Sequence, residues 1–302
     1  MHSRNLIGRR SFLAGVGGLA AVAALGGCAS ASSEDTVIVG SKGFAESWIM
    51  GELYAQALRA TGRTVDLRTN VGSSEIIDKA MMSGQIDVFP EYTGVIVSSL
   101  AGYPEILPTA QETFDYAKNW EEERGVTVGT MTPFENKNAI AVTEQYAAQY
   151  NLTTIEDLRN VGEFVYSTYP DNVEGGSGYE AIVANYNLPN MQLKTLSIGL
   201  NYQALEAGEI QAADVFTTDP QLLRSNLVVL TDTLNMFGFQ NVVPLVAPGA
   251  MDRLGDDGLD LLNTINDLLT LEAIQTLNAA VAVNRLDPAQ VATQFLDVND
   301  LL

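Results

Sequence analysis

The chain has 302 residues, 46% hydrophobic and 18% charged, so it can bury one large core or two medium ones. Acidic residues outnumber basic ones by 37 to 16, and the formal net charge is −21. Such an acidic chain repels the phosphate backbone, so we expect no nucleic-acid partner. The sequence holds one histidine and one cysteine, both within the first 28 residues.

Residues 1–27 are interpreted as an export signal peptide. Arg9 and Arg10 precede an apolar run that is shorter than the ~20 residues needed to cross a bilayer. The Arg-Arg-Ser-Phe-Leu sequence resembles a twin-arginine signal, and Leu-Gly-Gly-Cys resembles a lipobox that ends at Cys28, the residue expected to be acylated. The alternative is an ordinary secretory leader with an incidental cysteine. We expect residues 28–35 to form a polar tether.

Removal of the leader would leave a chain without histidine, and its one thiol would carry lipid. This excludes Ser-His-Asp and Cys-His catalysis, histidine-ligated zinc and disulfides, and we expect no cofactor and no metal. A hydrolase that uses two carboxylates, such as a cell-wall glycosidase, is left open, with Glu91 and Asp219 as its candidates. A surface adhesin is a third possibility, although no repeat or low-complexity region supports it.

The segment after the tether alternates strands and helices, an order typical of a parallel sheet. The predicted elements are a strand at 36–40, a helix that ends at Gly62, a strand at 64–69, a helix at 72–84 and a strand at 86–89. A charged helix end at 119–124 then leads into a strand at 126–131.

A second α/β segment is predicted from about 136 to 240. Its elements include a helix at 144–150, a capping box at 153–156, a strand at 164–167 and a glycine-containing loop at 169–178. The tail is predicted to be helical at 257–269, at 272–282 and after Asp287-Pro288.

Residues 80–89 resemble residues 204–216. Each segment reads as a helix closed by a glycine and followed by a strand, with aromatic, hydroxyl and acidic residues at the strand's end. In open α/β sheets, ligands bind beyond the carboxyl ends of the strands. We therefore expect two lobes that face each other across a cleft; the alternative is a chance match between two amphipathic units.

Three segments resemble the substrate-binding proteins of osmoprotectant ABC importers, which bind glycine betaine, choline, carnitine or related quaternary amines. They read VGSKGFAESWIMGELYAQAL, GSSEIIDKAMMSGQIDVFPEYTG and NYQALEAGEIQAADVFTTDPQL. The resemblance implies an α/β, two-lobed periplasmic-binding-protein fold (type II-like), in which each lobe is a mostly parallel sheet flanked by helices. It places lobe 1 at 36–135 with 243–302, and lobe 2 at 136–242. It also implies an extracytoplasmic, lipid-anchored protein that is not an enzyme, with an ABC permease and ATPase subunits as partners.

The resemblance also assigns ligand-binding residues. A quaternary ammonium has no N–H group, so aromatic rings must bind it, at ~0.5–2 kcal/mol each. Tyr92 matches a cage tyrosine, and Phe216 falls at another cage position without its hydroxyl. Asn138 and Gln240 replace cage aromatics, and amides favour a hydroxylated or N–H-bearing ligand over a bare trimethylammonium. We therefore expect a small polar or zwitterionic solute, with quaternary amines as the leading class.

Further candidates lie near the starts of the first two helices. Trp48 falls where the family has a glutamine for the ligand's carboxylate, and Ser74 falls at a polar ligand contact. Ser73 and Thr93, beside Ser74 and Tyr92, complete the predicted set. The alternatives are core packing for Tyr92, Trp48 and Phe216 and helix capping for the two serines. Lys42 is either solvated or close to the cleft, and the 169–178 loop lacks the arginine with which some relatives clamp a carboxylate.

Overall fold

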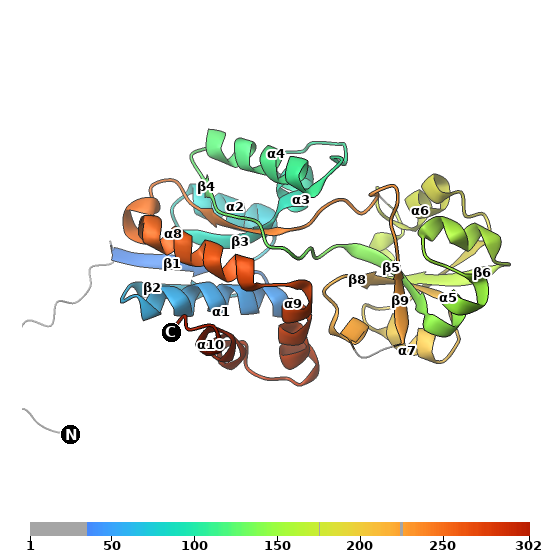
Figure 1. Cartoon of the computed structure of the whole chain (residues 1–302). Coiled ribbons are helices and arrows are strands. Elements are labelled where there is room, and N and C mark those ends of the chain that lie inside the picture. The colour runs from blue at the N-terminus through green and yellow to red at the C-terminus, as the bar shows by residue number, and fades with distance from the viewer. Residues whose placement is uncertain (1–34, 175, 224–225) are drawn as a thin grey trace, which may run out of the picture.

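Two five-stranded sheets lie side by side and define two lobes (Figure 1). The computed structural model describes residues 35–174, 176–223 and 226–302. The predicted signal peptide, Cys28 and the tether up to residue 34 lie outside these residues. In the described part of the chain, no helix is both long and apolar enough to cross a membrane.

The sheet of lobe 1 is mostly parallel. Its strands, in spatial order, are β2 (Thr64–Arg68), β1 (Thr36–Gly40), β3 (Val88–Tyr92), β10 (Val242–Val246) and β4 (Thr127–Val128). Only β10 runs against its neighbours. Strands β3 and β10 are buried along their whole length, as expected for a sheet covered on both faces.

Helices from both ends of the chain cover this sheet (Figure 1). They are α1 (Ala45–Ala60), α2 (Ser74–Met82), α3 (Thr93–Val95), α4 (Ala110–Glu123), α8 (Met251–Leu268), α9 (Leu271–Asn278) and α10 (Pro288–Val298), with π-helical turns at Ile96–Leu100 and Ala279–Val283. Helix α1 packs along α10, and its Ile49, Leu53 and Tyr54 are fully buried in one continuous core.

Lobe 2 has a second mostly parallel sheet with its own helices. The strands, in spatial order, are β7 (Met191–Thr195), β6 (Phe164–Thr168), β8 (Ala212–Phe216), β5 (Asn138–Thr143) and β9 (Leu227–Leu230). The helices are α5 (Glu144–Tyr150), α6 (Tyr179–Tyr186) and α7 (Leu200–Glu206), with 3-10 turns at Ile155–Asn160, Pro170–Asn172 and Pro220–Leu223. Two apolar clusters form its core.

The chain crosses between the lobes twice, and each crossing leads into the one reversed strand of a sheet. Strand β5 follows the first crossing and β10 the second, and both are antiparallel to their neighbours. The crossing segments pair at a bridge between Glu135 and Asn241. The predicted fold class is confirmed. The limits of the lobes stay predictions, although Val242, placed in lobe 2, already pairs with Tyr92 in the sheet of lobe 1.

The repeat predicted between the lobes corresponds to equivalent elements. Strands β3 and β8 are each the central strand of a sheet. Each follows a helix that ends at a glycine with positive φ, Gly84 (φ +73) or Gly208 (φ +71), a conformation that glycine adopts without strain. Tyr92 and Phe216 are the last residues of these strands and therefore occupy matching positions in the two lobes.

Three local predictions were wrong in detail. The strand predicted at 86–89 begins at Val88 and includes Tyr92. The strand predicted at 126–131 is only β4, although the backbone N–H groups of Gly129 and Thr132 still donate to Pro244 and Val242 of β10. Between them, the Thr130 N–H donates to the Asn263 side chain. The capping box is one residue later than predicted and joins Thr154 to Asp157, whose carboxylate accepts the backbone N–H of Thr154.

Candidate functional site

Tyr92 lies at the edge of lobe 1 that meets lobe 2, and its ring is almost fully enclosed. Only 8% of the residue is exposed. Its hydroxyl donates to Glu46 Oε1 at 2.7 Å, and its ring stacks on Phe44 with centroids 6.4 Å apart. The Lys42 ammonium lies over the ring, 5.0 Å from its centroid. An internal cation therefore occupies the kind of position that a ligand ammonium was expected to take at Tyr92.

The charge of Lys42 is balanced by a buried carboxylate. Lys42 Nζ lies 2.6 Å from Glu91 Oε1, and Glu91 is 0% exposed. The same oxygen accepts the Tyr92 backbone N–H at 2.8 Å. A carboxylate enclosed in this way has no access to a glycosidic bond, so the structure gives no support to the hydrolase alternative.

Glu46 connects three parts of the molecule at the junction of the lobes. Besides the Tyr92 hydroxyl, it accepts from Asn136 on the first crossing segment (2.9 Å) and from Asn278 at the end of α9 (2.8 Å). Asn278 also donates to the carbonyl of Thr218 in lobe 2, at 3.1 Å. Burial and the neighbouring Glu46 carboxylate raise the pKa of Tyr92 well above its usual range, so the tyrosine stays protonated and donates this bond.

Asp214 is the corresponding buried carboxylate of lobe 2. It is 5% exposed and accepts from three neutral donors: Asn138 Nδ2 (3.0 Å), Thr168 Oγ1 (2.7 Å) and Asn172 Nδ2 (2.9 Å). Burial raises the pKa of Asp214, and these hydrogen bonds oppose that rise. No ion pair to Asp214 is present among the described residues. Asn138, one of the predicted ligand contacts, therefore binds this carboxylate.

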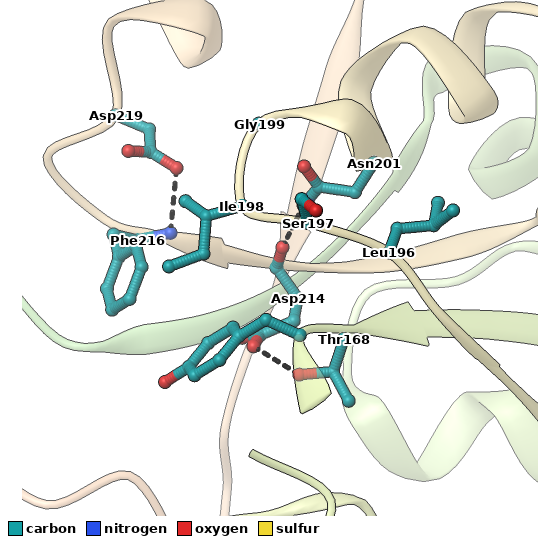
Figure 2. Close-up of a pocket in the computed structure, with 10 residues that line it drawn as sticks. Thr168, Leu196, Ser197, Ile198, Gly199, Asn201, Asp214, Phe216 and Asp219 are labelled. Carbon is teal, nitrogen blue, oxygen red and sulfur yellow. Dashed lines mark hydrogen bonds between the residues drawn. The ribbon is translucent and has the colours of Figure 1, made fainter. Parts of the chain in front are cut away.

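A small cavity lies beside Asp214 in lobe 2 (Figure 2), and we call it the lobe-2 cavity. It is lined by Thr168, Tyr169, Leu196, Ser197, Ile198, Gly199, Asn201, Asp214, Phe216 and Asp219. Its free volume of about 10 Å³ is enough for one water-sized group. The rings of Tyr169 and Phe216 stack with centroids 6.3 Å apart. Phe216, a predicted ligand contact, thus lies in a cavity that also contains two carboxylates.

A larger cavity of about 560 Å³ lies between the lobes, and we call it the inter-lobe cavity. Lobe 1 contributes residues from Gly94 to Thr113, and the other wall comes from Gly176, Ser177 and the segment Met236–Gln240. Its volume is within the range of small-molecule sites. Gln240, a predicted ligand contact, lines it, and the side-chain oxygen of this residue is buried with no donor among the described residues.

The remaining predicted residues are not brought together with these. Ser74 borders a third cavity in lobe 1, beside Glu91 and Glu121, which has no room for a water molecule. Three other predicted residues hydrogen-bond within the protein. The Trp48 indole donates to Asn70 at 2.9 Å, and the Ser73 hydroxyl donates to Glu75 at 2.5 Å. The Thr93 backbone N–H donates to the carbonyl of Asn241 at 2.8 Å. None of the three cavities is lined by any of the other five predicted residues, which are Trp48, Ser73, Tyr92, Thr93 and Asn138. Their roles in ligand binding stay predictions.

Sequence reasoning missed Asp214, Asn201 and Tyr169 as parts of a site. Asp214 and Phe216 both belong to the repeat and lie two residues apart near the end of β8. Since ligands bind near the carboxyl ends of such strands, this position could have indicated Asp214 as a second candidate beside Phe216. The contacts of Asn201 and Tyr169 with that strand depend on chain folding that no local pattern shows. Within the described residues, no group of three or more histidine, cysteine, aspartate or glutamate side chains is arranged to hold a metal ion.

Comparison with known proteins agrees with this geometry. Residues 35–298 match the family model for the substrate-binding domain of the ABC-type glycine betaine transport system. The carnitine transport binding protein OpuCC of Listeria monocytogenes is 28% identical over 277 residues, which cover 89% of this chain and 88% of that protein. A glycine-betaine-binding protein of Pseudomonas aeruginosa is 29% identical over 288 residues, 91% of each chain.

Solved structures show the same fold. Apo YehZ from Escherichia coli superposes with a TM-score of 0.75 at 23% identity, covering 88% of this chain and 99% of that one. Since the family model matches most of the chain, and two lobes of the expected topology enclose a cavity, the protein is a member of the substrate-binding domain family of ABC-type glycine betaine transport systems.

Proposed function

We propose that this protein is an extracytoplasmic lipoprotein that binds a small solute and delivers it to an ABC permease and its ATPase subunits. The solute is a quaternary amine of the glycine betaine, choline or carnitine type, or a related small zwitterion. The inter-lobe cavity carries the proposal: its volume of about 560 Å³ accommodates such a molecule, and both lobes line it. Closure of the lobes on the solute would then signal the loaded state to the permease.

The chemistry of the inter-lobe cavity supports a solute with a cationic amine. Three aromatic residues line it, Tyr103 from lobe 1 and Phe237 and Phe239 from the other wall. Aromatic faces attract ammonium groups, and the formal charge of −21 favours the encounter with cations at low salt. Gln240 would accept a hydrogen bond from a hydroxyl or N–H group of the solute, through an amide oxygen that has no donor among the described residues.

Calorimetric titration tests this function. The panel contains glycine betaine, choline, carnitine and proline betaine, with the less methylated dimethylglycine and dimethylethanolamine. We expect saturable heat and a raised Tm with at least one compound, and loss of that response in Gln240→Leu. The control is Ser99→Ala, an exposed residue that does not line the cavity and whose variant should keep the response. No heat with any compound would contradict the proposal.

The membrane anchor is proposed from the sequence alone. Acylation of Cys28 would attach the mature chain to the outer face of the cell membrane. We expect the intact protein to fractionate with membranes and a Cys28→Ser variant to be released. A lipid-free wild-type protein would contradict the anchor and leave the solute-binding proposal unaffected.

A further inference from the structure

The inter-lobe cavity is larger and more apolar than a betaine-sized solute requires. We propose that it binds an amine that carries an apolar extension of several carbon atoms, which we call the tail. The inference rests on the proposed function, because it specifies the substrate class of the same cavity. Four features of the cavity carry it: its size, the contacts between its walls, its lining and the position of an unpartnered polar group.

The size of the cavity exceeds that of the smallest candidate solutes. Glycine betaine and choline have at most about eight non-hydrogen atoms, and each atom takes no more than ~30 Å³, the share of a water molecule in the liquid. Such a solute fills less than half of the cavity's volume of about 560 Å³. Water would occupy the rest, and an apolar group that displaces poorly ordered water from an apolar wall gains affinity.

Two contacts join the walls of the cavity and hold them at this separation. At one end of the segment Met236–Gln240, Gly94 packs on the Phe239 carbonyl oxygen so closely that a Cβ on the glycine would lie 2.6 Å from it. Just before the other end, Asn235 Nδ2 donates to the carbonyl of Pro108 at 3.4 Å. The space between these contacts is therefore enclosed by joined walls, and it is not a gap left between separated lobes.

The lining of the cavity is predominantly apolar. Lobe 1 contributes Ile106 and Leu107, and the opposite segment contributes Met236 and Phe237. Ile106 is 51% exposed, so a solute that covers it removes apolar surface from water, which is favourable. Among the lining residues that the structure describes, Glu105 is the only charged one, and it is exposed. A compact, fully polar solute would leave most of this lining without a complementary partner.

The position of Gln240 orients such a solute. A Cβ on Gly94 would lie 2.6 Å from Gln240 Nε2, which places the amide at the Gly94 end of the cavity, and its Oε1 has no donor among the described residues. A hydroxyl on the solute's head satisfies this oxygen. The tail then extends along the segment toward Met236. At ~3.5 Å per residue the segment covers up to about 14 Å, which is enough for a six-carbon chain.

A homologous series tests the inference by calorimetric titration. Its members are choline and the two analogues in which a butyl or a hexyl chain replaces one N-methyl group, so the hydroxyl and the charge stay constant while the tail grows. Full burial of one CH2 group strengthens binding about fourfold. We therefore expect the hexyl analogue to bind at least 10-fold more tightly than choline, with the butyl analogue between them.

The other outcomes separate the inference from the proposed function. If any member of the series or of the betaine panel binds but the hexyl analogue gains less than 10-fold over choline, the inference is overturned and the proposed function stands. No binding by any of these compounds would overturn both. The compound 1-hexanol has the tail without the charged head and should bind more weakly than the hexyl analogue; equal binding would overturn the inference.

A pair of matched variants locates the tail. Ile106→Asn makes part of the apolar wall polar and should lower the ratio of the choline Kd to the hexyl-analogue Kd by at least threefold. Ile76→Asn is the control, because Ile76 on α2 is exposed to a similar degree (53%) and lines none of the three cavities. Its ratio should equal that of the wild type. Circular dichroism confirms folding, and Ile106→Ala replaces Ile106→Asn if that variant misfolds. Equal ratios in the folded variant and the control would overturn the inference.

Discussion

The Lys42 ammonium lies 5.0 Å from the centroid of the Tyr92 ring, although the two residues are fifty positions apart in the chain. Lys42 also pairs with Glu91, whose carboxylate accepts the Tyr92 backbone N–H. Cation, carboxylate and ring thus form one unit at the edge of lobe 1. This unit gives Tyr92 a structural role that its position in the Pro-Glu-Tyr-Thr-Gly motif does not reveal.

Loss of Lys42 should destabilise lobe 1. Lys42→Met leaves the Glu91 carboxylate buried and unpaired, and breaking a buried ion pair on one side costs about 3–5 kcal/mol. Urea unfolding measures the loss. The double variant Lys42→Met with Glu91→Gln removes both charges and should recover more than half of it; a double variant as unstable as the single one would contradict the pairing.

The Glu46 carboxylate should contribute more to the stability of the protein than an ordinary acidic residue in the first turn of a helix. Its carboxylate accepts three side-chain bonds, from Tyr92, Asn136 and Asn278. Glu46→Gln turns one acceptor into a donor that faces other donors, at an expected cost of about 1–3 kcal/mol. Thermal unfolding should show a lowered Tm for this variant and no change for Glu144→Gln, an exposed residue on α5. Equal Tm values would show that the three bonds contribute nothing.

Glu121 should make stability depend on pH near neutrality. Burial raises the pKa of this carboxyl from 4.5 to about 7, and the Arg124 guanidinium only partly opposes the rise. The unfolded chain releases this proton at lower pH than the folded one, so the free energy of unfolding falls as the pH rises from about 4.5 to about 7. The loss is on the order of 3 kcal/mol.

The non-titrating variant Glu121→Gln isolates this contribution. Urea unfolding of wild type and variant between pH 4.5 and pH 8 should show the wild type losing stability relative to the variant over that interval. A constant difference between the two proteins would contradict the raised pKa of Glu121.

Gly94 should be intolerant of any side chain. A Cβ at this position would lie 2.6 Å from the Phe239 carbonyl oxygen and 2.6 Å from Gln240 Nε2. Because one of these neighbours is backbone, Gly94→Ala would push the second crossing segment away from lobe 1, at a cost of about 1–3 kcal/mol. Gly162→Ala is the matched control, since a Cβ there has no atom within 4 Å. Equal melting temperatures for the two variants would contradict the contact.

Much of the fold could be predicted because local signals agree with the final structure. Strand β1 and helix α5 have the predicted bounds, and Asp287 caps α10 as the Asp-Pro pair indicates. The reversed strand β10 could not be predicted, because its apolar run Val242–Val246 contains no information about direction or partner. Its partners, β3 and β4, are more than a hundred residues away in the chain.

The candidate site was less predictable than the fold. Sequence reasoning identified Phe216 and Gln240, which the structure places in the lobe-2 and inter-lobe cavities, respectively. It could not show that Lys42 covers the Tyr92 ring, because that contact depends on how β1 and β3 pair. Nor could it show that Asn138 binds Asp214, since cross-strand neighbours follow from the register of β5 against β8.

Hydrogen–deuterium exchange with and without saturating solute tests the central claim most directly, namely that a small amine binds between the lobes. We expect slower exchange on both sides at once, in residues 94–107 of lobe 1 and in residues 236–240 on the opposite wall of the inter-lobe cavity. The exposed helix α5, remote from the cavities, should exchange at the same rate in both states. Protection confined to one lobe, or spread evenly over the chain, would contradict a solute held between them.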